Sequence, residues 1–225
     1  MARFGEVIAD LKGVDHGVVA VGVVSTARYF APTVLAEFMK IHPQVKIQLL
    51  VGNREKTMEK LESMELDFAI TGLPPDHFGV KKEFISKHPQ IIIASPDHPL
   101  AHKQRISLSE LQDETFLLRE PGSGTRSVTD KLFARNRNLP GSGLEFGSNE
   151  TIKQAVMAGM GIAVISAHTV AAELKEKRLV ALDVKGTPIN RKWFVVKHAN
   201  KRFLPSAQAL WNFVARNGKH YLPGP

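Results

Sequence analysis

The chain has 225 residues, of which 43% are hydrophobic and 23% are charged, a composition typical of a soluble globular protein. It contains no cysteine, which excludes disulfides, thiolate zinc sites and a cysteine nucleophile. The net charge of +8 permits anionic partners, but the basic residues are scattered and not interleaved with aromatic ones, so the chain is not expected to read a DNA sequence.

Nothing in the sequence indicates export or membrane insertion. No apolar run approaches the roughly 18 residues that a membrane span needs. Residues 1–6 contain no apolar segment of a secretory signal, and residues 1–14 resemble a tail or linker. We therefore expect a cytoplasmic protein that does not bind membranes.

Segments typical of strands and helices alternate along the chain. Strands are expected at 17–24, 45–51, 67–71 and 91–94, and helices around 30–41 and 58–64. After a break at Pro96 and Pro99 the alternation begins again. Strands are then expected at 115–118, 144–146, 161–165, 179–184 and 193–196, and helices around 128–132, 149–158, 167–175 and 204–213.

This alternation predicts an α/β fold with mostly parallel sheets, helices on both faces, and two lobes. In such sheets, ligands bind outside the carboxyl ends of the strands. The turns that lead from a strand into a helix are therefore the places where a functional site is expected.

Three of these turns share one design, in which small hydroxyl or amide residues precede a helix: 24–27, 122–126 and 147–150. A helix N-terminus offers unpaired N–H groups and a partial positive charge, which suits an anion. Serine, threonine and asparagine are also preferred N-caps, so simple capping is the alternative at each turn.

Arg119 and Arg126 flank the second turn. A guanidinium can bind a carboxylate or phosphate through two parallel hydrogen bonds. The alternative is a structural ion pair, for instance with Glu120 or Glu150. The glycines at 122–124 match neither a Walker loop nor a dinucleotide fingerprint.

Signals of an enzyme are weak. His98 and His102 lie in a proline-rich turn without the helix and glutamate of a metalloprotease. His168 follows a strand with no nucleophile placed beside it, and no Gly-x-Ser-x-Gly motif exists. We therefore expect no catalytic residues, no metal site and no cofactor.

Several motifs together resemble LysR-type transcription regulators. The longest are 120–126 (EPGSGTR) and 148–163 (SNETIKQAVMAGMGIA). His42-Pro43, 66–70 and 98–101 fall in the same order as in that family, and the resemblance covers roughly residues 15–216. Segments 25–32, 52–55 and 165–174 are similar to the regulators of the RuBisCO (Calvin-cycle) operon.

The resemblance implies two Rossmann-like lobes of the type 2 periplasmic-binding-protein kind, joined by two crossover strands near 91–97 and 191–196. Lobe I would comprise residues 15–96 plus 192–225 and lobe II residues 97–191, with residues 1–14 a remnant of the linker helix. LysR regulators carry an N-terminal winged helix-turn-helix, which this sequence lacks, so DNA binding is expected only through that absent domain. A homodimer or tetramer is expected, paired through the helices at 31–41 and 149–158.

The resemblance also implies that a small anionic, phosphorylated metabolite binds between the lobes as the effector. Family positions at the strand ends, together with Arg119 from the argument above, give the expected effector-binding residues Ser25, Thr26, Thr71, Gly72, Arg119, Thr125, Arg126, Ser148, Asn149 and Ser166. The family's usual proline after the 161–165 strand is Ser166 here, which adds a polar group. An exported solute-binding protein of the same fold is the alternative function, and an enzyme on this fold is a third.

Overall fold

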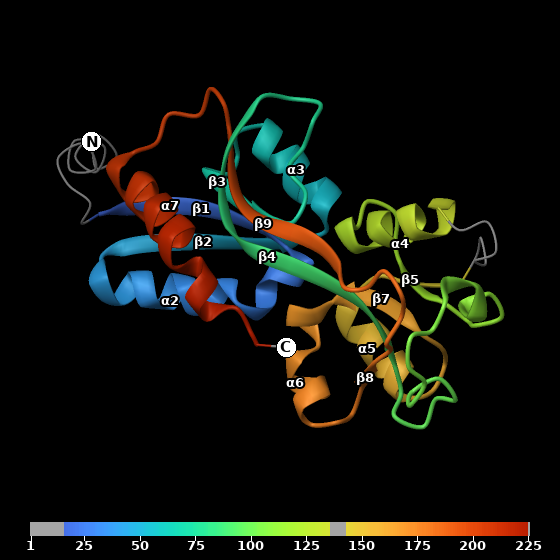
Figure 1. The fold of residues 1–225 in the computed structure, drawn as a ribbon. Helices are drawn as coiled ribbons and strands as arrows, with labels where there is room; N and C mark the ends of the chain where they lie inside the picture. Colours follow the sequence, from blue (N-terminus) through green and yellow to red (C-terminus); the bar gives the residue numbers. More distant parts are fainter. Residues whose placement is uncertain (1–15, 136–142, 225) are drawn as a thin grey trace. The chain divides into compact units, whose positions relative to one another are not determined.

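The computed structural model describes residues 16–135 and 143–224, and the expected linker remnant at 1–14 lies outside them. The chain forms two compact units (Figure 1). The first comprises the described residues up to Ser86 together with Lys192–Leu222, and the second is built from Lys87–Arg191. The chain passes from one unit to the other within two long strands, β4 (Val80–Ala94) and β9 (Ile189–His198).

The first crossing lies earlier than the sequence suggested. It was expected after residue 96, but it falls between Ser86 and Lys87. The reason is that Gln90–Ala94 already pair with strands of the second unit. The strand expected at 91–94 in fact begins at Val80, because its first part is rich in lysine and half exposed and so lacks the apolar run used to recognise strands.

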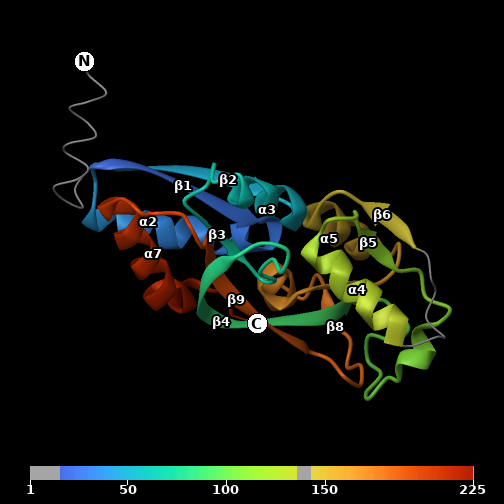
Figure 2. The ribbon, with the colours of Figure 1, turned by 90° about the horizontal axis from the view of Figure 1, so that it is seen from above.

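The sheet of the first unit has the order β2-β1-β3-β9-β4. Strand β1 (Gly17–Val24) is parallel to β2 (Val45–Gly52) and β3 (Phe68–Thr71), and β3 is antiparallel to β9. Helices α2 (Ala31–Ile41) and α7 (Pro205–Asn217) cover one face of this sheet and α3 (Arg54–Glu62) covers the other (Figure 2). Phe38, Trp193 and Trp211 are buried in the core beneath α2 and α7.

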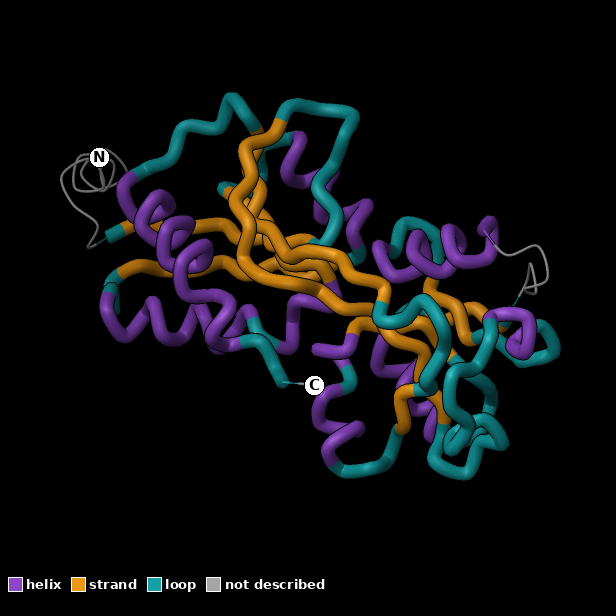
Figure 3. Tube along the Cα trace, in the orientation of Figure 1, coloured by secondary structure: helices purple, strands orange, loops and turns teal. Residues whose placement is uncertain are grey.

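In the second unit, β5 (Leu117–Arg119) and β6 (Leu144–Phe146) are parallel, and β4 is antiparallel to β7 (Ala163–Ser166) and to β8 (Val180–Ala181). A parallel bridge from Phe116 to Ile162 joins β5 to β7. Helix α4 (Gly124–Arg135) packs into one hydrophobic core and α5 (Asn149–Met157) into another, to which Leu174 of the short α6 (Ala171–Lys175) also belongs. Figure 3 shows the helices and strands along the chain.

The turn that leads into β7 depends on a glycine. Gly161 has a φ of +152°, and a Cβ there would lie 2.1 Å from the carbonyl oxygen of Thr115. Gly161→Ala is expected to lower the free energy of unfolding by about 3 kcal/mol or more, because backbone strain and overpacking each cost about 1–3 kcal/mol. Urea unfolding measures this loss.

Gly159→Ala is the matched control, since Gly159 has a φ of +78° but no atom within 4 Å of the added methyl. It should cost only the left-handed backbone strain, about 1–2 kcal/mol. Equal losses in the two variants would show that the contact with Thr115 is not the cause.

Candidate functional site

Three strands of the second unit end at the same edge. β5 is parallel to β6 and is joined to β7 by a parallel bridge, so Arg119, Phe146 and Ser166 lie at one edge of the unit. β4 runs antiparallel to β7, with Gln90 opposite Ser166. We call this the polar edge and define it by His88, Gln90, Arg119, Asn149, Ser166 and His168.

Arg119 holds Asn149 in a fixed orientation. Its guanidinium is buried, donates through Nε and Nη2 to the two carboxylate oxygens of Glu120 at 2.7 and 2.8 Å, and donates through Nη1 to Oδ1 of Asn149. Oδ1 of Asn149 is therefore occupied, whereas its buried Nδ2 has no hydrogen-bond partner among the described residues. An unsatisfied buried amide costs about 1–3 kcal/mol, so Nδ2 is a donor ready for a ligand acceptor.

Ser166 and Gln90 add two more buried polar groups. Both residues are 0% exposed, and neither Oγ of Ser166 nor Oε1 of Gln90 has a partner within the described part of the chain. They face each other across β7 and β4. Buried polar atoms are usually satisfied, so three such atoms at one edge point to a binding site.

Two histidines complete the polar edge. The rings of His88 and His168 are stacked, with centroids 6.1 Å apart. Burial lowers the pKa of both imidazoles, and the charge of Arg191 lowers the pKa of His88 further. Both rings are therefore neutral near pH 7 and can donate through one nitrogen and accept through the other.

His88 and Gln90 were missed from the sequence. They belong to the part of β4 that carries no apolar run, and a histidine and a glutamine in a charged stretch are typical of an exposed loop. Only the pairing of β4 with β7 brings them to the polar edge.

The structure shows Arg126 in ion pairs. Its guanidinium donates to Asp130 at 2.8 Å, to Glu145 at 3.1 Å and to the carbonyl oxygen of Arg119 at 2.9 Å. The hydrogen bond to Asp130 is the main cause that raises the pKa of Arg126. The structural ion pair, weighed as the alternative above, is what the geometry supports for Arg126.

In the turns before α4 and α5, a serine hydroxyl accepts a hydrogen bond from a backbone N–H of the following helix. Oγ of Ser148 accepts from the backbone N–H of Thr151 at 3.1 Å and caps α5, as the capping alternative predicts. Thr125 is buried in the first turn of α4, and its backbone N–H donates to Oγ of Ser123.

The remaining expected residues form a second group in the first unit. Ser25 and Thr26 follow β1, and Thr71 and Gly72 stand at the end of the parallel neighbour β3. Ser25 and Thr26 begin a short 3-10 turn (Ser25–Tyr29), which separates them from α2 at Ala31, so they do not lie directly at the helix N-terminus. Oγ1 of Thr71 accepts from the N–H of Leu73 at 3.2 Å and so holds its own turn.

No group of three histidine, aspartate or glutamate side chains suited to a metal ion exists within residues 16–135 and 143–224. None of the helices described in those ranges is long and apolar enough to span a membrane.

The neutral histidine pair predicts a pH dependence of stability. The folded-state pKa values of His88 and His168 lie below the ordinary value of 6.5, so the unfolded chain binds more protons below that pH. Their contribution to stability is present above about pH 6.5 and falls at lower pH, by up to about 1.4 kcal/mol per pH unit for each histidine.

Urea unfolding at about pH 7.5 and about pH 5.5 checks this expectation. His88→Gln should reduce the difference between the two pH values, whereas His102→Gln, at an exposed position, should leave it unchanged. A His88→Gln variant with the full pH dependence would contradict the assignment.

Known proteins match the chain over most of its length. The LysR substrate binding domain family matches residues 12–219. The chain is 47% identical over 218 residues to the HTH-type transcriptional regulator CbbR of Xanthobacter flavus, covering 96% of this chain and 66% of that protein. It is 42% identical over 209 residues to the RuBisCO operon transcriptional regulator of Allochromatium vinosum, covering 93% and 69%. The chain thus spans about two thirds of the length of these relatives.

Solved structures confirm the fold class. The regulatory domain of Synechocystis PCC6803 CcmR, in complex with 2-PG, superposes with a TM-score of 0.85 at 37% identity over 89% of this chain and 96% of that one. The effector binding domain of QuiR, in complex with shikimate, gives a TM-score of 0.81 at 20% identity, which shows the fold alone. The relatives are named transcription regulators and not enzymes. The chain therefore belongs to the LysR substrate binding domain family, the effector-sensing part of LysR-type transcription regulators.

Proposed function

We propose that the chain senses a small phosphorylated metabolite of carbon fixation, which binds at the polar edge of the second unit. The observation that carries the proposal is the buried Nδ2 of Asn149, whose amide is held by Arg119 and lacks an acceptor in the described residues. The relatives named for the RuBisCO operon and the structural relative bound to 2-phosphoglycolate support the class of metabolite.

The polar edge suits an anion with several oxygen atoms. Nδ2 of Asn149 and Oγ of Ser166 can donate to it, and Thr125 and Asn149 stand in the first turns of α4 and α5, where helix dipoles favour negative charge. Arg119 acts as a positioning residue, because its hydrogen bond to Oδ1 turns Nδ2 of Asn149 toward the ligand.

In the first unit, we propose Thr26 and Ser25 separately, as hydroxyl donors at the end of the strand that precedes them. Thr26 is buried at the end of β1, and Ser25 begins the 3-10 turn. Thr71 and Gly72 shape the neighbouring strand end, because the hydroxyl of Thr71 holds its own turn. Ser148 supports the site by capping α5, the helix that begins with Asn149. Arg126 supports it by donating to the carbonyl oxygen of Arg119 while it is held in its ion pairs.

A thermal-shift series tests this function. A phosphorylated effector at 100 times its dissociation constant should add about 2.7 kcal/mol to stability, which corresponds to roughly 5–10 °C for a chain of this size. We expect this shift with 2-phosphoglycolate or another phosphorylated intermediate of carbon fixation, and not with glycolate. Equal shifts with and without the phosphoryl group, or none with any phosphorylated compound, would overturn the proposal.

We further propose that the whole protein acts on DNA through a helix-turn-helix segment of the kind named in its relatives, and that two copies of this domain pair through α2. The support for pairing is apolar exposure at the end of α2, where Met39 is 43% and Ile41 is 62% exposed. Met39 and Ile41 are two residues apart and project from different sides of α2, so Ile41, the more exposed, is the side chain that we place in the interface. A tetramer of such pairs is compatible with this arrangement.

Ile41→Glu is expected to convert a dimer to a monomer, because a carboxylate would be buried without a partner in the interface. Light scattering at micromolar concentration measures the mass. Thr33→Glu, at an exposed position about two turns earlier in α2, serves as the control and should stay dimeric. A wild-type chain that is monomeric in this assay would rule out pairing through α2.

A further inference from the structure

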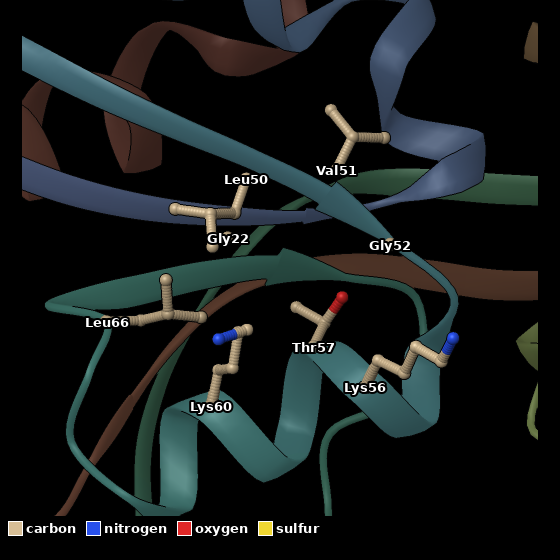
Figure 4. Close-up of a pocket in the computed structure, with 8 residues that line it drawn as sticks. All are labelled: Gly22, Leu50, Val51, Gly52, Lys56, Thr57, Lys60 and Leu66. Carbon is tan, nitrogen blue, oxygen red and sulfur yellow. The ribbon is translucent and has the colours of Figure 1, made fainter.

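A cavity lies within the first unit, on the side of the sheet that α3 covers. It has a volume of about 130 Å³ and is bounded by β1, β2 and α3 (Figure 4). An engineered apolar cavity of about 150 Å³ in another protein holds a benzene molecule, so this space fits a phenyl ring or a short branched chain.

Gly22 of β1 lines the cavity and lets Leu66 pack directly against the strand. A Cβ at Gly22 would lie 2.4 Å from Cδ1 of Leu66, so any larger residue there would displace Leu66 from the cavity wall. Glycine in a strand interior weakens the strand and often marks close approach of another group. β2 is the edge strand of the described sheet. No further strand of that sheet therefore lies next to Leu50 to close the cavity on that side.

The walls of the cavity are apolar on the sheet side and cationic on the helix side. Leu50, Val51 and Leu66 supply the apolar surface, and Lys56 and Lys60 line the other side (Figure 4). The two lysines are four residues apart in α3 and therefore share one face of the helix.

The lysine charges are available to a ligand. Nζ of Lys60 pairs with Glu65 at 2.7 Å, but both side chains are about half exposed, and surface ion pairs of this kind are weak. Nζ of Lys56 makes no ion pair with the acidic residues that the structure describes. Because lysine stems can cover apolar surface without any ligand, probes with and without a negative charge distinguish a binding role of Lys56 and Lys60 from simple packing.

We propose that the first unit carries a second small-molecule site, which binds an aromatic or branched short-chain carboxylate or phosphate monoester between β2 and α3. The apolar group would occupy the cavity against Leu50, Val51 and Leu66, and the anionic group would lie against Lys56 and Lys60. This site is independent of the polar edge in the second unit.

An NMR titration of the chain with benzoate, phenyl phosphate and benzyl alcohol tests the proposal. Both anions should shift the backbone amides of Gly22, Gly52 and Thr57 in a saturable way, with benzyl alcohol at least about tenfold weaker, since a charge-assisted hydrogen bond is worth about tenfold or more. No saturable shift at these amides, or equal affinity for the alcohol, would overturn it.

Two variants and one control separate the contributions. Leu50→Trp fills the cavity and should abolish binding of all three probes, and retained binding would place them elsewhere. The double variant Lys56→Gln with Lys60→Gln should weaken the affinity for the two anions at least about tenfold and leave the affinity for benzyl alcohol unchanged. This variant tests the proposal even if Leu50→Trp fails to fold. Lys46→Gln, on β2 outside the cavity, should behave like wild type. Asn149→Asp changes the polar edge only and should leave binding of the three probes to the cavity unchanged. The cavity site and the metabolite site at the polar edge are thereby tested independently of each other.

Discussion

Asn149→Asp is expected to lower the affinity for the phosphorylated metabolite by at least about 100-fold. The substitution preserves the shape of the side chain and the oxygen that accepts from Arg119, but it replaces the unpartnered Nδ2 donor with a carboxylate oxygen. Loss of a charge-assisted hydrogen bond costs about 1.5–3 kcal/mol, or roughly 10- to 150-fold, and repulsion between like charges adds to it. Isothermal titration calorimetry with 2-phosphoglycolate measures the change.

The same variant should remain folded. A carboxylate beside the buried guanidinium of Arg119 gains an ion pair, so the free energy of unfolding is expected to equal or exceed that of wild type. Asn190→Asp makes the same charge change at an exposed position of the second unit and should bind like wild type. An Asn149→Asp affinity within about threefold of wild type would remove Asn149 from the site, since it would correspond to less than about 1 kcal/mol.

Lys153→Met is expected to lower the free energy of unfolding by about 3–5 kcal/mol, because it leaves a buried carboxylate without its partner. Lys153 on α5 is 4% exposed, and its Nζ donates to Glu173 of α6 at 2.8 Å and lies 2.9 Å from Glu150. Arg178 lies 3.8 Å from Glu173 and is half exposed, so it compensates only weakly. Urea unfolding followed by circular dichroism measures the loss.

A second substitution identifies the cause. Lys153→Met combined with Glu173→Met should recover most of the stability, because replacing a whole buried pair with apolar residues is often neutral. Lys131→Met, at an exposed position of α4, should change stability by less than about 0.5 kcal/mol. A loss of less than about 1 kcal/mol in the Lys153 variant would mean that this buried pair does not anchor α5, the helix that begins with Asn149.

The alternation of elements could be predicted because the strands β1, β3, β5 and β7 are largely buried on both faces and so form apolar runs. β1 and β3 are continuous apolar runs between helices, so their position and their parallel pairing followed from the sequence. Arg119 and Asn149 were expected at the polar edge because each stands at or just beyond a recognised strand end, whereas Ser166 was expected from the family resemblance.

The parts that could not be predicted depend on pairing between distant segments. His88 and Gln90 reach the polar edge only because the charged first part of β4 continues into the strand that pairs with β7. Arg126 has the residue type that binds phosphate. Its partner Asp130 is four residues along α4 and follows a local helix pattern, but its second partner Glu145 lies on β6, and no local pattern connects the two. A serine before a helix is equally typical of an N-cap and of a ligand-binding turn. The sequence therefore could not assign the role of Ser148, and the hydrogen bond from Thr151 in the structure identifies it as a cap.

The most direct test of the account is a crystal structure of the chain with 2-phosphoglycolate, or with the phosphorylated compound that gives the largest thermal shift. We expect oxygen atoms of the metabolite within hydrogen-bond distance of Nδ2 of Asn149 and Oγ of Ser166, two buried polar-edge donors that have no partner in the described residues. A bound metabolite that leaves both atoms without a partner would contradict the assignment of the effector site to the polar edge.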